Sequence, residues 1–161
     1  MRKFFCLLIL LSSISITACS TGSNREMLNL QTAQDCLESF FALLSYGAYE
    51  QAASLYAGSY EELHSINPGI PVDNYAALWE SACTLNGYQC LKIKQVLQAY
   101  ADGNGVYHFL VEFKRSNGEP LVVGPCCGAD ATQMPPRSQF EFKVIRRKGR
   151  FLVQDMPIYV P

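Results

Sequence analysis

The amino-acid sequence predicts an α+β fold in which N-terminal helices pack on a curved antiparallel β-sheet. Up to Cys90, apolar residues recur every three or four positions, as they do along one face of a helix. Beyond Cys90 they alternate with polar residues, as in half-buried strands, and Asn-Gly and Asp-Gly pairs mark turns between these segments. Helices in one half of a chain and strands in the other are typical of the α+β class.

The first expected helix begins at Thr32, which would cap it together with Asp35 three residues on. Gly47 is expected to end this helix, because glycine readily adopts the left-handed conformation that follows many helices. The spacing of its apolar residues places one stripe on the core: Ala33, Cys36, Leu37, Phe40, Phe41 and Leu44.

A second helix is expected over about 48–57, and residues 59–65 add a further turn. Asp73 is expected to cap a third helix. The apolar stripe of that helix consists of Tyr75, Leu78, Trp79 and Ala82.

The strands are expected at 91–101, 106–115, 120–124, 138–147 and 150–156, with a long loop over 125–137. In the first of these, the apolar alternation changes phase at Val96, which predicts a β-bulge near Gln95. The inward-facing residues are expected to be Tyr107, Phe109, Val111, Phe113, Phe140, Phe142 and Val144.

The N-terminal segment has a basic start at Arg2 and Lys3, an apolar stretch from Phe4 to Ile16, and the run Ile16-Thr17-Ala18-Cys19. This arrangement resembles a bacterial lipoprotein signal peptide with its lipobox. The resemblance implies that Cys19 receives a diacylglyceryl thioether and that the chain is cut just before it. An ordinary signal peptide cleaved nearby is the alternative.

These features divide the chain into a signal peptide (1–18), a lipidated cysteine with a flexible tether (19–31) and a globular domain (32–161). The expected location is the extracytoplasmic face of a bacterial cell membrane or outer membrane, with the protein held through Cys19. After residue 18, no apolar run approaches the length of a membrane-spanning helix.

The charge of the chain argues against nucleic-acid binding. Loss of Arg2 and Lys3 with residues 1–18 would change the formal net charge from −1 to −3. A general nucleic-acid binder needs a broad positive face, and a mildly acidic domain does not provide one.

The cysteines predict disulfides, because thiols outside the cytoplasmic membrane tend to oxidise. Cys83 and Cys90 flank an Asn-Gly turn and form the expected local bridge. A second bridge is expected from Cys36 to either Cys126 or Cys127, with Cys127 preferred.

A metal site is not expected, and neither is a cofactor. The adjacent Cys126 and Cys127 cannot easily chelate one zinc ion, and no Cys-x-x-Cys accompanies them. The two histidines, His64 and His108, lie at no spacing typical of metal ligands.

Two segments resemble the nuclear transport factor 2-like fold, also called cystatin-like, which ketosteroid isomerase and SnoaL-type cyclases share. One is the helix pair formed by residues 36–44 and by Tyr-Glu-Gln-Ala-Ala at 49–53; the other is the closing hairpin at 144–155. The resemblance covers about 33–157. It implies a curved sheet that encloses a conical pocket, and dimerisation through the outer face of the sheet.

Enzymes of this family place acidic, tyrosine or histidine side chains inside the cone, whereas other members use it for binding or assembly. Here His108 and Glu112 share one face of a strand, so they would either line the pocket as a base and its partner or face solvent opposite the apolar set. Asp35, Tyr46 and Tyr49 are weaker candidates for pocket residues.

A basic hairpin at 146–150 would contact anionic lipid or an acidic partner, or it is simply a charged turn that stays soluble.

Taken together, these features lead us to expect a lipid-anchored extracytoplasmic domain without catalytic activity, which holds a small apolar ligand or a protein partner near the membrane. The alternatives are a cyclase- or isomerase-like enzyme that uses a pocket histidine or acid, and a structural lipoprotein of an envelope complex.

Overall fold

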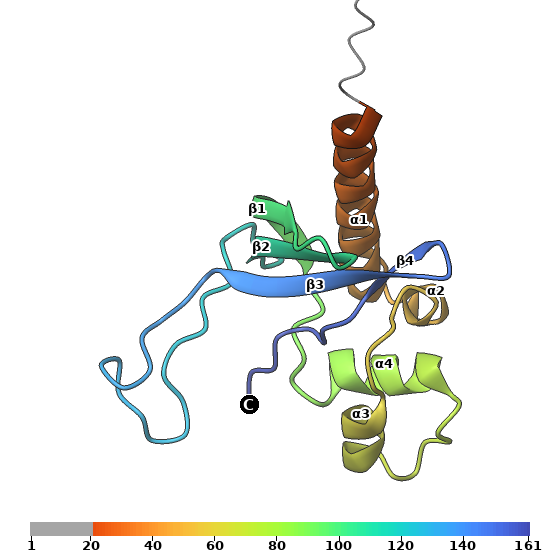
Figure 1. The fold of residues 1–161 in the computed structure, drawn as a ribbon. Helices are drawn as coiled ribbons and strands as arrows, with labels where there is room; N and C mark the ends of the chain where they lie inside the picture. Colours follow the sequence, from red (N-terminus) through yellow and green to blue (C-terminus); the bar gives the residue numbers. More distant parts are fainter. Residues whose placement is uncertain (1–20) are drawn as a thin grey trace, which may run out of the picture.

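The computed structural model describes residues 21–161 and has the predicted α+β architecture (Figure 1). The strands form one antiparallel sheet in the order β1-β2-β3-β4. Its elements are α1 (Thr21–Ser45), α2 (Tyr49–Ala53), α3 (Glu61–Ile66), α4 (Tyr75–Thr84), β1 (Lys92–Ala101), β2 (Val106–Lys114), β3 (Phe140–Arg147) and β4 (Arg150–Val153). The expected signal peptide and the lipidation site at Cys19 lie outside the described residues.

Helix α1 begins earlier than the sequence predicted, so the expected start at Thr32 is wrong. The Thr32 hydroxyl donates to the Leu28 carbonyl oxygen at 2.8 Å, and the Asp35 carboxylate accepts from the Gln31 amide at 2.9 Å. Both contacts join residues four apart inside a continuous helix. Residues 21–31 are therefore helical rather than a flexible tether, and Figure 1 shows this part of α1 projecting beyond the sheet.

The helix ends follow the local signals closely. Gly47 has a φ of +75° and follows α1, as predicted, and the Ala48 amide donates to the Leu43 carbonyl oxygen at 2.9 Å. The cap of α4 is Asn74 and not Asp73, because the Asn74 side-chain oxygen accepts from the Ala77 amide at 3.2 Å.

The predicted bulge in β1 is present. The pairing with β2 shifts between Ile93 and Gln95, and it shifts again between Val96 and Gln98. Two shifts so close together increase the local twist and bend the edge of the sheet.

The short strand expected at 120–124 does not form. Only isolated bridges occur there, between Lys114 and Pro120 and between Val123 and Arg137. Prolines at 120 and 125 lack the amide hydrogen that a longer ladder would require.

Aromatic rings fill the space between the helices and the inner face of the sheet. The Phe41 ring packs edge-on against Phe113 and Phe142, with centroids 4.8 and 4.9 Å apart, and Phe40 packs against Trp79 at 5.6 Å. All five side chains are fully buried, and the predicted inward-facing strand residues are buried with them. The centre of the domain is therefore a packed core.

Candidate functional site

A surface groove of about 410 Å³ lies between α3, the turn after α4 and the C-terminal segment, residues 157–161. Its apolar lining includes Ile66, Leu85, Tyr159 and Val160, and its polar lining includes Glu62, Asn86 and Tyr88. We call this feature the groove. It brings together three parts of the chain that are far apart in sequence.

The wall of the groove is a short turn closed by a disulfide. Cys83 and Cys90 are bonded, with Cα atoms 5.4 Å apart, as the sequence predicted. Between them, Gly87 has a φ of +78°, which a residue with a Cβ rarely adopts. The cross-link restricts the freedom of the residues between the two sulfurs.

The C-terminal segment is fixed to this turn by main-chain hydrogen bonds. The Val160 amide donates to the Gly87 carbonyl oxygen at 3.1 Å, and the Gln89 amide donates to the Ile158 carbonyl oxygen at 2.7 Å. A Cβ at Gly87 would lie 2.5 Å from the Val160 carbonyl oxygen. Glycine at this position therefore permits the close approach of the two segments.

Polar contacts tie the turn to α3 and to the loop after it. The Tyr88 phenol donates to a Glu62 carboxylate oxygen at 2.5 Å. The Asn86 amide donates to Asn67 Oδ1 at 2.9 Å, and the buried Ser81 hydroxyl donates to the same oxygen at 2.5 Å. Burial and the bond to Glu62 raise the pKa of Tyr88, so its phenol stays a hydrogen-bond donor at neutral pH.

Large apolar side chains are exposed around the groove. Leu85 is 80% exposed, Tyr159 54% and Ile66 47%. Clustered exposure of this kind is typical of surfaces that bind a partner, whereas single exposed apolar residues are common everywhere. The groove thus combines an ordered backbone with apolar surface open to water.

His108 and Glu112 lie on the outer face of the sheet, opposite the core, and each has its own partners. The His108 ring stacks on Tyr100 with centroids 4.7 Å apart, and its Nε2 atom is 3.7 Å from an Asp102 carboxylate oxygen. Glu112 accepts from the Gln95 amide at 2.9 Å. The structure therefore does not bring His108 and Glu112 together as a catalytic pair.

The depression beside His108 has a volume of about 30 Å³, close to that of one water molecule. Asp102, which the sequence did not single out, mainly closes the hairpin turn. Its carboxylate accepts from the Asn104 amide at 2.8 Å, and this bond is the main reason that the pKa of Asp102 is lowered.

The second expected disulfide is absent, because Cys36, Cys126 and Cys127 are all free thiols. The Cys36 thiol lies on α1 and donates to the Phe151 carbonyl oxygen at 3.2 Å. The loop 125–137, which carries Cys127, extends away from α1 and from β4 (Figure 1). Burial raises the pKa of the Cys36 thiol to about 11.

The other predicted candidates make local contacts. The Lys92 ammonium lies over the exposed Tyr46 ring, 3.6 Å from its centroid, and a hydrogen bond from Lys92 lowers the pKa of Tyr46. In the basic hairpin, the Arg146 guanidinium lies 5.6 Å from the Phe151 ring centroid, and Arg150 donates to the Ser54 carbonyl oxygen at 3.2 Å.

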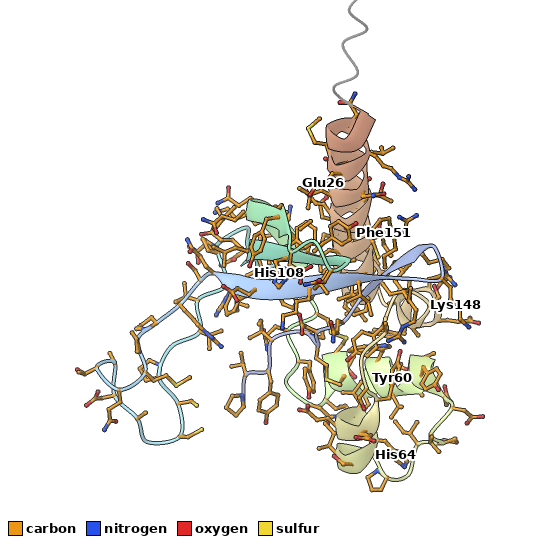
Figure 2. All side chains as sticks on the ribbon, in the orientation of Figure 1. Glu26, Tyr60, His64, His108, Lys148 and Phe151 are labelled. Carbon is orange, nitrogen blue, oxygen red and sulfur yellow. A yellow bond between two sulfur atoms is a disulfide. The ribbon has the colours of Figure 1, made fainter. Side chains whose placement is uncertain are left out.

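Within residues 21–161, no three histidine, cysteine or acidic side chains are grouped as metal ligands. Figure 2 shows the two histidines on separate elements, His108 on the sheet and His64 on α3. None of the described helices is both long enough and apolar enough to cross a bilayer. Comparisons of the chain with models of protein families, with curated proteins and with solved structures find no match.

Proposed function

We propose that this protein is a lipid-anchored extracytoplasmic interaction domain, without catalytic activity, that holds an apolar segment of a protein partner in the groove. The observation that carries the proposal is the exposure of Leu85, Tyr159 and Ile66 around a groove whose wall is closed by a disulfide. An ordered apolar surface needs little reorganisation on binding, so less of the binding free energy is lost.

The exposure of the rim favours a protein segment over a small apolar ligand. Small-molecule sites enclose most of the ligand surface, whereas side chains at a protein interface are exposed until the partner arrives. Leu85, at 80% exposed, could be covered only by something that extends over the rim. The second oxygen of Glu62 adds a hydrogen-bond acceptor for an amide or a basic group of the partner.

The anchor in this proposal rests on the run Ile16-Thr17-Ala18-Cys19. Helix α1 begins two residues after Cys19, and its N-terminal part, in which residues 24–28 are exposed, would act as a stalk between the lipid and the domain. Residues 21–31 rise about 16 Å as a helix, at about 1.5 Å per residue. A helical stalk holds the groove at a more constant height than a flexible chain would.

The packed centre of the domain supports a non-catalytic role. A cyclase- or isomerase-like enzyme needs a cavity that admits a substrate beside its acid or base. The expected cone is occupied by buried rings such as Phe41 and Phe142, and the depression beside His108 has a volume of only about 30 Å³.

A homodimer through the outer face of the sheet remains part of the proposal. Tyr100 on β1, which pairs with His108 of the outer face, is 55% exposed. Such pairing would leave the groove free, because the groove lies between α3, the turn after α4 and the C-terminal segment.

The proposal is tested by affinity purification of the full-length protein from its own membranes, with the wild type compared with Leu85→Glu. Val72→Glu is the matched control, since Val72 is a 64% exposed apolar residue that does not line the groove. We expect a defined protein to be lost with Leu85→Glu and retained with Val72→Glu. Recovery of the same proteins from all three preparations would contradict the role of the groove. If Leu85→Glu instead lost a small apolar molecule and no protein, the groove would be the site of a small ligand.

A further inference from the structure

Loop 125–137 presents two adjacent thiols at the surface of the protein. The sulfur atoms of Cys126 and Cys127 are 2.9 Å apart, with the Cys127 thiol directed at the Cys126 sulfur. Cys127 is exposed and Cys126 is half-buried. Two sulfurs in contact at an accessible site are placed to react with each other, unlike the solitary Cys36 thiol beneath β4.

The backbone of the loop holds the pair in an unusual turn. Cys127 has a φ of +59° and Gly128 a φ of +91°, and the Ala129 amide donates to the Cys126 carbonyl oxygen at 3.0 Å. A positive φ is unfavourable for a residue with a Cβ, such as Cys127. Backbone strain of this kind in an exposed loop favours the interpretation that the loop has a function. The conformation is supported from the next turn, where the Asp130 carboxylate accepts from the Thr132 and Gln133 amides.

We propose that Cys126 and Cys127 form a redox-active vicinal dithiol, which closes into a disulfide by exchange with a disulfide of another molecule. The Cys127 thiolate attacks one sulfur of the incoming disulfide, forms a mixed disulfide and releases the first thiolate. The Cys126 thiolate then attacks Cys127 Sγ and displaces the second thiolate. Two cysteine thiols are oxidised, the incoming disulfide is reduced to two thiols, and the two protons pass to solvent or to the released thiolates.

The order in which the two thiols attack follows from their different exposure to solvent. Cys127 is exposed to an incoming disulfide, whereas Cys126 is half-buried.

The product is an eight-membered ring, which is more strained than the larger ring closed by Cys83 and Cys90. A strained disulfide is reduced more easily, so the pair would cycle while the bridge beside the groove persists. The proposal requires neither the groove nor the lipid anchor, so it can fail without affecting the proposed function.

Trypsin separates the cysteines in a way that makes the test direct. Cleavage after Arg115 and Arg137 gives the peptide 116–137, which contains only Cys126 and Cys127, whereas Cys36, Cys83 and Cys90 fall together in 26–92. The full-length protein in mild detergent, with Cys126 and Cys127 reduced, is treated with oxidised glutathione, alkylated and digested. We expect peptide 116–137 to lose two hydrogens, about 2 Da, and to carry no alkyl group.

The single variants test the order of attack. Cys126→Ser is expected to stop at a stable glutathione adduct on Cys127, and Cys127→Ser is expected to react more slowly because its remaining thiol is half-buried. Full alkylation of both cysteines in the wild type would overturn the proposal. A glutathione adduct that persists on either cysteine of the wild type would also overturn it. A covalent link between peptides 116–137 and 26–92 would also overturn it, because Cys36 would then be the partner.

Discussion

The phenol of Tyr88 donates a 2.5 Å hydrogen bond to the carboxylate of Glu62 and so joins the turn after α4 to helix α3. The same turn is bonded through Gly87 to the C-terminal segment. Tyr88 thus holds the turn to α3, and the adjacent Gly87 holds it to the C-terminal segment, so both sides of the groove are bonded to the same turn.

Gly87→Ala is expected to destabilise the protein more than Gly103→Ala does. Both glycines have a positive φ, +78° and +81°, so both substitutions carry a backbone cost of about 1 kcal/mol. Only at Gly87 would the added Cβ approach the Val160 carbonyl oxygen, since nothing lies within 4 Å of a Cβ at Gly103. Urea unfolding measures the difference, and equal losses in the two variants would show that the C-terminal segment is not held at Gly87.

Removal of the disulfide by Cys83→Ser with Cys90→Ser is expected to lower the free energy of unfolding by about 2–3 kcal/mol, the chain-entropy cost of opening so short a loop. It is also expected to increase hydrogen exchange at residues 84–89. The double variant Cys126→Ser with Cys127→Ser is the control, because those thiols are not bridged in the structure. An unchanged free energy of unfolding in the first variant would contradict the stabilising role of the bridge.

Stability is expected to fall above pH 10, in part because of Tyr60. Burial raises the pKa of Tyr60 from 10.0 to about 12, so its folded form holds the proton more tightly than its unfolded form does. This contribution is complete below pH 10 and is lost as the pH rises toward 12. Tyr60→Phe should therefore flatten the decline in urea stability over this interval, whereas Tyr159→Phe, at an exposed position, serves as the control. A decline as steep in Tyr60→Phe as in the wild type would exclude this assignment.

Under the proposed lipid anchor, Cys19→Ala is expected to release the protein from the membrane fraction or to leave the N-terminal segment uncleaved, because the lipid would be attached through the cysteine sulfur. Fractionation and the intact mass of the purified protein provide the two readouts. Cys6→Ala is the control, because Cys6 lies in the preceding apolar stretch from Phe4 to Ile16 and not in the run Ile16-Thr17-Ala18-Cys19. Equal membrane association, together with a mass that differs from the wild type only by the substitution itself, would exclude the anchor.

Local patterns predicted most of the fold. The alternation along β2 and β3 identified the buried face, and the change of phase at Val96 located the bulge seen beside Gln95. The Asn-Gly turn brought Cys83 and Cys90 together as expected. Each of these features is determined by residues within a few positions of one another.

What could not be predicted depends on contacts between distant segments. Thr32 resembles a cap, but the helix formers Arg25, Glu26, Met27 and Leu28 lie before it, and α1 runs through Thr32 without a break. The groove arises because the segment around Tyr159 returns to pair with Tyr88, and no periodicity in residues 157–161 signals that pairing. The partner of Cys36 was mistaken because the direction of loop 125–137 is a property of the folded chain.

The most direct test of the groove is photo-crosslinking in living cells, with a benzophenone amino acid placed at position 85 and, separately, at position 72. Both positions carry exposed apolar side chains, and only Leu85 lines the groove. We predict a discrete protein adduct from position 85, none from position 72, and loss of the adduct when Tyr159→Glu is added. The same adduct from both positions, or none from position 85, would contradict the account.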